Sequence, residues 1–205
     1  MSKKKPLIVF EGVEGSGKTT LINHISNILK KKKIKFIKIR EPGGSKNSEQ
    51  IRKLILKKNN DFNSFTDLFL YLAARSENIE KIIRKNYNKR IILLDRFIDS
   101  TIAYQHYGMN LNKNLIEIIN KLLLVNIKPH LIFLNIVSMK NLSLRLKNRK
   151  NKNRYDRFNI KFYNRVQNGF IKISKNKKNY IIIDSNKDIN NNKKLVLNNI
   201  LNLIK

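Results

Sequence analysis

The sequence contains no cysteine and no tryptophan, and its 205 residues include only 7 glycines and 3 prolines. Without cysteine, neither a disulfide framework nor a thiolate-bound metal site can form. No apolar run approaches the ~20 residues of a membrane-spanning helix. The apolar run at residues 7–10 is too short for the core of a signal peptide. We therefore expect a cytoplasmic protein that has no membrane partner.

Acidic residues are also scarce, with 14 Asp and Glu against 44 Lys and Arg and a net charge of +30. Such a charge can attract nucleic acid or an acidic membrane surface. However, the basic residues are mostly lysines scattered among Asn and Ile, three residue types with A/T-rich codons, so a biased genome would produce this composition without selection for binding. The charges do not cluster into a recognisable nucleic-acid module. We expect no nucleic-acid partner, although the charge favours any anionic substrate.

Short apolar runs alternate along the chain with segments whose apolar residues recur at helical spacing. Strands that are apolar throughout and are joined by helices are typical of a parallel α/β sheet. We predict a doubly wound, five-stranded parallel sheet with helices on both faces, in a single domain spanning residues 1–205. Ligands of such sheets bind at the carboxyl ends of the strands. The predicted strands cover residues 7–10, 36–39, 91–94, 131–136 and 180–183.

Three of the few glycines lie in one loop, residues 12–19 (GVEGSGKT), which matches G-x-x-x-x-G-K-[ST] at every fixed position. A predicted strand precedes it and an amphipathic helix follows. The glycines let successive N–H groups point at phosphate oxygens, and the helix adds its positive end. Lys18 is expected at the β- and γ-phosphates and the Thr19 hydroxyl on Mg²⁺. The predicted ATP-binding residues are Gly12, Val13, Glu14, Gly15, Ser16, Gly17, Lys18, Thr19 and Thr20.

The loop alone does not define the reaction. A GTPase would carry an N-K-x-D element, and the nearest stretch, at residues 186–188, has its aspartate one place early. A large ATPase motor would need a longer chain. Two classes remain from the residues themselves: a compact kinase for a small acceptor, or a basic nucleic-acid protein with an ATP switch.

Other strand ends favour the kinase. Arg40 follows the second predicted strand, Arg96 follows the third, and Arg75 lies on a helix between them. The planar fork of arginine suits phosphate and carbonyl groups, and two phosphate-bearing substrates need several such charges to offset their repulsion. Asp95 closes an apolar strand, where a carboxylate can orient Mg²⁺ or its waters. The predicted metal residues are therefore Thr19 and Asp95.

Four stretches, FEGVEGSGKTT, REPGG, AAR and DRFIDSTIAYQ, occur in this order and spacing, and through them the chain resembles the thymidylate kinase family. The likeness extends from residue 5 to about residue 173. It implies phosphorylation of dTMP to dTDP with ATP and Mg²⁺, in dTTP biosynthesis, by a homodimer. Another P-loop kinase of deoxynucleotides or deoxynucleosides is the alternative.

The resemblance also implies residue roles. Glu14 would meet the sugar 3′-hydroxyl, Arg75 the thymine carbonyl and Arg96 the dTMP phosphate. Phe69 is the candidate to stack on the base, and Tyr104 would lie against the deoxyribose and disfavour a 2′-hydroxyl. The implied dTMP-binding set is Glu14, Arg40, Pro42, Phe69, Arg75, Arg96, Ser100, Thr101, Tyr104 and Gln105.

The basic segment at about residues 145–158 resembles the family's lid. Some members carry a catalytic arginine in the glycine loop, but here that place holds Ser16 or Val13, so this chain is similar to members that carry the charge in the lid. Residues 140–157 contain eight Lys or Arg and one acid. The segment departs from the family's D-R-x-E pattern, with Asn159 in the last place, and it lacks the lid glycine. The predicted catalytic set is Lys18, Arg96, Arg149 and Arg154, with Arg145 next.

Overall fold

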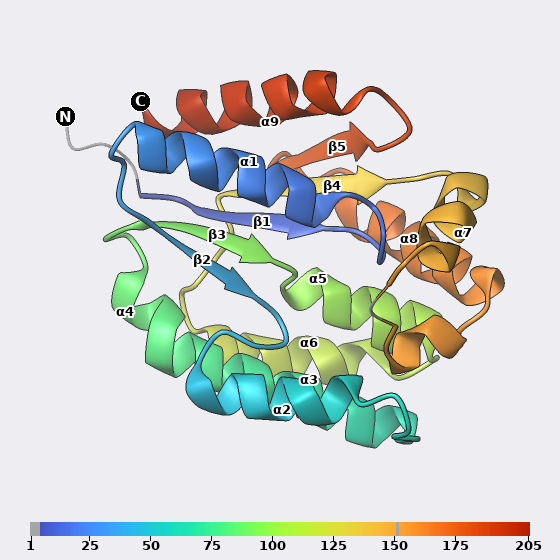
Figure 1. Cartoon of the computed structure of the whole chain (residues 1–205). Coiled ribbons are helices and arrows are strands. Elements are labelled where there is room, and N and C mark those ends of the chain that lie inside the picture. Colours follow the sequence, from blue (N-terminus) through green and yellow to red (C-terminus); the bar gives the residue numbers. More distant parts are fainter. Residues whose placement is uncertain (1–4, 151) are drawn as a thin grey trace.

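The computed structural model describes residues 5–150 and 152–205. Its centre is a parallel sheet of five strands in the order β2-β3-β1-β4-β5 (Figure 1). Each predicted apolar run lies within one strand, so the predicted five-stranded fold is confirmed. The strands are β1 (Leu7–Glu11), β2 (Phe36–Arg40), β3 (Ile91–Asp95), β4 (Leu131–Ile136) and β5 (Tyr180–Asp184).

Burial explains why the strands are so apolar. β1 is buried along its whole length, and β3 and β4 are buried except at their last residue. Helices cover both faces of these inner strands, so side chains on either face meet protein rather than water. The edge strands β2 and β5 are less covered and expose Lys38 and Ile182, respectively.

Helices lie on both faces of the sheet (Figure 1). α1 and α9 pack together over one face, with Leu21, Ile25 and Ile200 in a core shared with Phe10 of β1. α3, α6 and α8 contribute to the cores on the other face. The helices are α1 (Lys18–Lys31), α2 (Lys46–Leu56), α3 (Ser64–Asn78), α4 (Arg84–Asn86), α5 (Ile98–Thr101), α6 (Lys113–Leu124), α7 (Met139–Lys147), α8 (Ile160–Ser174) and α9 (Ile189–Ile204).

Three tighter or wider helical segments complete the chain: π-helical Ile79–Ile83 and Ile102–Gly108, and 3₁₀-helical Arg154–Arg157. The first joins α3 to α4 in one long helical run. Asparagine and serine side chains cap several helices, such as Asn63 on α3 and Asn159 on α8. Their oxygens accept hydrogen bonds from the otherwise unpaired N–H groups of the first turn.

The parallel register places the motif residues at one edge of the sheet. Asp95 pairs with Arg40 on one side and with Phe10 on the other, so the ends of β1, β2 and β3 are neighbours. In the part of the chain that the structure describes, no helix combines the length and apolar character needed to span a membrane.

Candidate active site

The glycine loop connects the buried end of β1 to the first turn of α1. Gly12 and Gly17 have φ values of 132° and 91°, a region that favours glycine. A Cβ atom at Gly12 would also clash with the backbone oxygen of Asn135 on β4. Lys18 folds back over the loop, and its Nζ donates to the carbonyl oxygens of Gly12 and Val13, both at 2.9 Å. The loop thus curls around its own lysine.

Lys18 is only 6% exposed to solvent. Burial, followed by repulsion from Arg96, lowers the pKa of Lys18 to about 8. An anion beside this amine would stabilise its charged form, so the loop is electrostatically suited to a phosphate.

Neighbouring strand ends and the lid hold the outer side of the loop. Ser185, just after β5, donates its hydroxyl to the carbonyl of Ser16 at 2.7 Å, and Asn135 donates to the same oxygen at 3.2 Å. Arg145 of α7 donates to the carbonyls of Gly15 (3.0 Å) and Ser185 (2.7 Å). These contacts fix the position of the loop from three separate elements. Sequence reasoning missed Asn135 and Ser185, although both lie where the strand-end rule directs attention.

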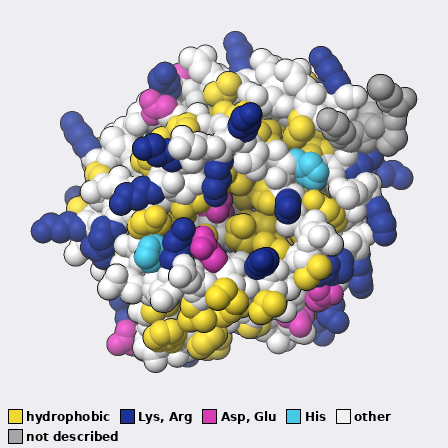
Figure 2. Space-filling model, turned by 180° about the vertical axis from the view of Figure 1, so that it is seen from behind, with side chains coloured by type: hydrophobic (Ala, Val, Ile, Leu, Met, Phe, Trp, Pro, Cys, Tyr) yellow, Lys and Arg dark blue, Asp and Glu magenta, His cyan; other side chains and the backbone are white. Residues whose placement is uncertain are grey.

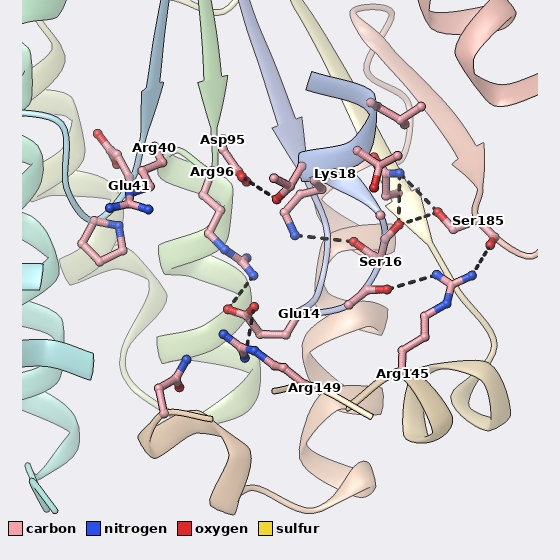
Figure 3. Close-up of a pocket in the computed structure, with 18 of the residues that line it drawn as sticks. Glu14, Ser16, Lys18, Arg40, Glu41, Asp95, Arg96, Arg145, Arg149 and Ser185 are labelled. Carbon is pink, nitrogen blue, oxygen red and sulfur yellow. Dashed lines mark hydrogen bonds and ion pairs between the residues drawn. The ribbon is translucent and has the colours of Figure 1, made fainter. Parts of the chain in front are cut away.

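A cavity of about 660 Å³ opens in front of the loop at the carboxyl edge of the sheet (Figure 3). The loop forms one wall, the segment after β2 another, and the lid a third. Of the predicted site residues, the cavity is lined by Glu14, Gly15, Ser16, Gly17, Lys18, Thr19, Thr20, Arg40, Pro42, Asp95, Arg96 and Arg149.

Arg96 is held in a fixed orientation between the loop and the neighbouring helix. Its guanidinium donates to the carbonyl of Gly12 at 2.9 Å, to Ser100 Oγ at 3.1 Å and to Glu14 Oε1 at 3.1 Å. It also lies over the ring of Tyr104, 5.1 Å from its centroid. The φ of Arg96 is 68°, uncommon for a side-chain-bearing residue, so the backbone is strained to present this group.

Glu14 lies between two arginines. Its Oε1 pairs with Arg96 at 3.1 Å, and its Oε2 lies 3.7 Å from Arg149 Nη1 of the lid (Figure 3). Burial alone would raise the pKa of the Glu14 carboxyl, but Arg96, Lys18 and Arg149 together lower it. The carboxylate therefore stays ionised and links the loop to the lid.

Thr19 and Asp95 also come together. The Thr19 hydroxyl donates to Asp95 Oδ2 at 3.4 Å, and Asp95 Oδ1 is buried without a hydrogen-bond partner among the described residues. A buried, unsatisfied carboxylate oxygen next to a hydroxyl suits a hard cation or its water.

Comparisons with known proteins identify the family to which this site belongs. The family model described as thymidylate kinase matches residues 10–196. The chain belongs to the thymidylate kinase family. A thymidylate kinase of Thermosipho africanus is 38% identical over 185 residues, covering 90% of this chain and 92% of the relative. One of Acholeplasma laidlawii is 36% identical over 199 residues, covering 95% and 98%. The crystal structure of a thymidylate kinase from Ehrlichia chaffeensis superposes with a TM-score of 0.77 at 32% identity, covering 96% of this chain and 98% of that one.

Two residues that the thymidylate kinase resemblance assigned to the base do not lie in the cavity. Phe69 is 54% exposed and stacks against Phe65 on the outer side of α3. Arg75 is 1% exposed and donates to Glu41 Oε2 (2.7 Å), Asn120 Oδ1 (2.8 Å) and the carbonyl of Phe97 (2.9 Å). Its guanidinium connects the segment after β2 to α6 and to the turn after β3, so the structure gives Arg75 an internal bracing position.

Four more residues of the predicted dTMP-binding set are divided between the interior and a small recess. Ser100 and Tyr104 line a recess of about 20 Å³ next to Arg96. Gln105 is buried and donates to Asp67 Oδ2 at 2.9 Å. Thr101 is buried, and its Oγ1 has no hydrogen-bond partner in residues 5–150 and 152–205.

The lid arginines also point in different directions. Arg149 lines the cavity, whereas Arg154 is 7% exposed and forms an ion pair with Asp67 of α3. Arg154 Nη2 also donates to the Tyr155 hydroxyl at 3.2 Å. Arg154 does not line the cavity at the glycine loop, because the buried carboxylate of Asp67 holds its charge in the interior; its catalytic role stays a prediction.

Sequence reasoning also missed Tyr71 of α3 and Arg52 of α2, which line the cavity. Arg52 donates to the carbonyl of Pro42 at 2.6 Å, which places its guanidinium beside the segment after β2. Tyr71 lies four positions before Arg75, and this i, i+4 spacing places both on the same side of α3. That spacing was the available signal that Tyr71, and not Phe69, faces inward.

Proposed function

We propose that the protein transfers the γ-phosphoryl group of ATP to dTMP, producing dTDP and ADP. One observation carries the proposal: the phosphate loop and Arg96 face one cavity, and Arg96 is bonded to the loop itself through Gly12 and Glu14. An acceptor phosphate held by Arg96 would lie next to the triphosphate end of a nucleotide on the loop. Membership of the thymidylate kinase family supports dTMP as that acceptor.

The ATP side of the cavity uses the loop. Its backbone N–H groups and the start of α1 would surround the β- and γ-phosphates, with Lys18 as the mobile cation. Binding would draw the Lys18 amine from the carbonyls of Gly12 and Val13 to the phosphates. Ser185 and Asn135 would keep the loop in place during this change.

The dTMP side uses residues from several elements. Arg96 would bind the phosphate, and Glu14 would accept a hydrogen bond from the sugar hydroxyl. Tyr71 presents an aromatic ring to the cavity for stacking on the base, and Pro42 and Arg52 line the same cavity. The unsatisfied Thr101 hydroxyl is available for the edge of the base once the recess beside Tyr104 opens.

The chemistry needs alignment more than acid–base catalysis. An oxygen of the dTMP phosphate attacks the γ-phosphorus in line, the bond from that phosphorus to the β–γ bridging oxygen breaks, and ADP leaves. A phosphate monoester is already largely ionised near pH 7, since its second pKa is about 6, so no strong general base is required. Lys18, Arg96 and Arg149 supply positive charge around the transferred group.

We also propose a magnesium ion held by the Thr19 hydroxyl and by Asp95, directly or through its waters. The fit rests on the buried, unsatisfied Asp95 Oδ1 beside Thr19. Within the described residues there is no group of three or more His, Cys, Asp or Glu that could form a metal cage. This agrees with Mg²⁺, which keeps several waters and takes one or two protein ligands plus substrate phosphates. When bound, Mg²⁺ would neutralise charge on the phosphates.

Residues 145–158 are proposed as the lid of one nucleotide-kinase domain. Arg145 already contacts the loop, and Arg149 reaches Glu14, so the segment spans the mouth of the cavity. Closure over the substrates would exclude water and suppress ATP hydrolysis.

A homodimer through α3 and α6 is proposed as well. Phe65 and Phe69 of α3 and Ile118 and Leu122 of α6 are 50–69% exposed. Figure 2 shows hydrophobic side chains gathered along the lower edge, where Figure 1 places these helices. Contiguous exposed apolar surface of this kind marks an interaction site.

Light scattering after gel filtration should give a dimer mass for the protein and a monomer mass for Phe69→Glu. A monomer mass for the unaltered protein would refute the dimer.

A coupled assay with ATP, Mg²⁺ and a panel of acceptors tests the function. The panel is dTMP, dUMP, dCMP, dGMP and thymidine, and we expect the highest kcat/KM with dTMP. Lys18→Ala should keep its circular dichroism spectrum and lose nearly all turnover. A higher kcat/KM for another acceptor, or normal turnover by Lys18→Ala, would overturn the assignment.

A further inference from the structure

A second cavity lies on the other side of the lid from the glycine loop. Its volume is about 510 Å³, within the range of about 300–1,000 Å³ that is usual for small-molecule sites. Its walls are the α2–α3 connection, the end of the π-helical segment Ile102–Gly108, the 3₁₀ segment of the lid and the start of α8. The two cavities share no lining residue.

The second cavity is strongly cationic. Arg154, Arg157 and Arg165 line it, against one acid, Asp61. Arg165 donates one N–H to the carbonyl of Gly108 at 3.0 Å, and Arg157 donates one to the carbonyl of Lys58, near the start of the α2–α3 connection. These bonds orient both guanidinium groups and leave their other N–H groups available for an anion.

Aromatic rings lie beside these charges. Phe158 and Phe162 stack with their centroids 3.9 Å apart and an angle of 12° between the rings, and Arg165 lies over Phe162 at 5.7 Å. Phe62 forms another part of the wall, under the guanidinium of Arg154 at 5.3 Å. Phe162 is buried behind Phe158, which is half-buried, so a flat ring can stack on the outer face of Phe158 while its anionic substituents meet the arginines.

One buried donor in this wall has no partner. Arg154 is 7% exposed, and its Nε has no hydrogen-bond acceptor among the residues that the structure describes, although its Nη2 is bonded to Asp67 and Tyr155. Unsatisfied buried donors are rare and call for an explanation. An acceptor atom of an occupant in this cavity would supply the missing bond after a small shift of Phe62.

We propose that the second cavity is a nucleotide-binding site, separate from the cavity at the glycine loop. The base would stack on Phe158, which Phe162 supports from behind, and the phosphates would lie at Arg157 and Arg165. The contacts themselves select an aromatic anion, and the choice of a nucleotide rests on the proposed function. The product dTDP requires one further phosphoryl transfer to become dTTP, so dTTP is the probe that carries both the thymine ring and the largest charge.

Titration calorimetry on the full-length protein tests this site. The protein is first saturated with dTMP and a non-hydrolysable ATP analogue, in the presence of Mg²⁺, so that the first cavity is filled. dTTP should then bind with one equivalent per chain. Arg157→Ala combined with Arg165→Ala should weaken this binding at least tenfold. Arg165→Ala alone, on α8 and outside the lid, should also weaken it while kcat and KM for dTMP stay unchanged. Arg90→Ala, at an exposed arginine outside both cavities, is the matched control and should bind dTTP normally.

The site is refuted if no dTTP binds to the saturated protein, if more ATP analogue displaces it, or if the double variant binds it as well as the unaltered chain does. The test of this site can fail while the proposed function holds, and the reverse is also true. Binding at these arginines by a protein without dTMP kinase activity would leave the second site standing and remove the function. A normal kinase without this binding would do the reverse.

Discussion

All arginines carry the same guanidinium group, and the residues that each one contacts decide whether it faces the cavity. Arg75 is enclosed by Glu41, Asn120 and a carbonyl, so it is held away from the cavity. Arg149 faces the cavity, its contacts to Glu14 and Asp156 are long, at 3.7 and 3.5 Å, and its Nη1 makes no hydrogen bond within the described chain. Its guanidinium is therefore the lid charge that is available to a phosphoryl group.

Arg149→Ala should lower kcat by about 10³, at the lower end of the range known for arginines that stabilise phosphoryl transfer. KM for ATP and for dTMP should change far less, because this charge acts mainly in the transition state. Lys150→Ala removes an exposed neighbouring charge and serves as the control in the same steady-state assay. A kcat of Arg149→Ala within tenfold of the unaltered enzyme would exclude this role.

Glu11, directly before the glycine loop, should make stability depend on pH. Its carboxyl is fully buried and accepts from the backbone N–H of Phe97 at 2.8 Å and from Ser100 Oγ at 2.6 Å. Burial, and then the nearby Asp99, raise the pKa of Glu11 to about 8, although Arg96 acts to lower it.

Because the folded-state pKa of Glu11 lies above the unfolded value, the group stabilises the fold below about pH 4.5 and loses this contribution as the pH rises toward 8. Glu11→Gln should flatten that part of the profile, measured as melting temperature between pH 5 and 8. Parallel profiles for the two proteins would show that Glu11 is already ionised in the fold.

At the scale of elements, Asp67 joins the lid to the body of the protein. This 1% exposed carboxylate of α3 pairs with Arg154 of the lid, accepts from the Tyr155 hydroxyl at 2.9 Å and accepts from Gln105 at 2.9 Å. Removal of either ionic partner would leave the other charge buried and unpaired.

Arg154→Met and Asp67→Leu should each destabilise the protein by about 3–5 kcal/mol, and the double substitution should cost much less than their sum. Urea unfolding of the four proteins provides the complete cycle. If Arg154 instead acted on the transferred phosphoryl group, Arg154→Met would have normal stability and a large loss of kcat. Additive free energies would show that the two side chains do not depend on each other.

The elements show where sequence reasoning succeeds. Strands β1, β3 and β4 are buried on both faces, so they appear in the sequence as unbroken apolar runs, and the phosphate loop is recognisable because its backbone path requires glycine. Which face of α3 turns inward is harder to infer, since Phe69 and Tyr71 are both aromatic. Successive residues of a helix are about 100° apart, so these two rings point in nearly opposite directions. The orientation of Arg75 and Arg154 depended on Glu41 and Asp67, partners distant in sequence that no local pattern reveals.

At the scale of the whole molecule, the net charge of +30 acts on both substrates, which are anions. A field of this sign raises the rate of encounter and is screened by salt, since the Debye length is about 10 Å at 0.1 M. Between 20 and 300 mM KCl, kcat/KM for dTMP should fall several-fold while kcat at saturation changes little. A fall in kcat alone would indicate that salt acts on the closed site and not on encounter.

If one cavity holds a triphosphate on the glycine loop and a monophosphate at Arg96, with the reacting ends adjacent, a single molecule that joins adenosine to thymidine through five phosphates should fill it. This compound should compete with both ATP and dTMP in a binding assay and bind far more tightly than either. Lys18→Ala and Arg96→Ala should each weaken its binding. Competition with only one substrate, or affinity no better than that of ATP alone, would contradict the shared cavity.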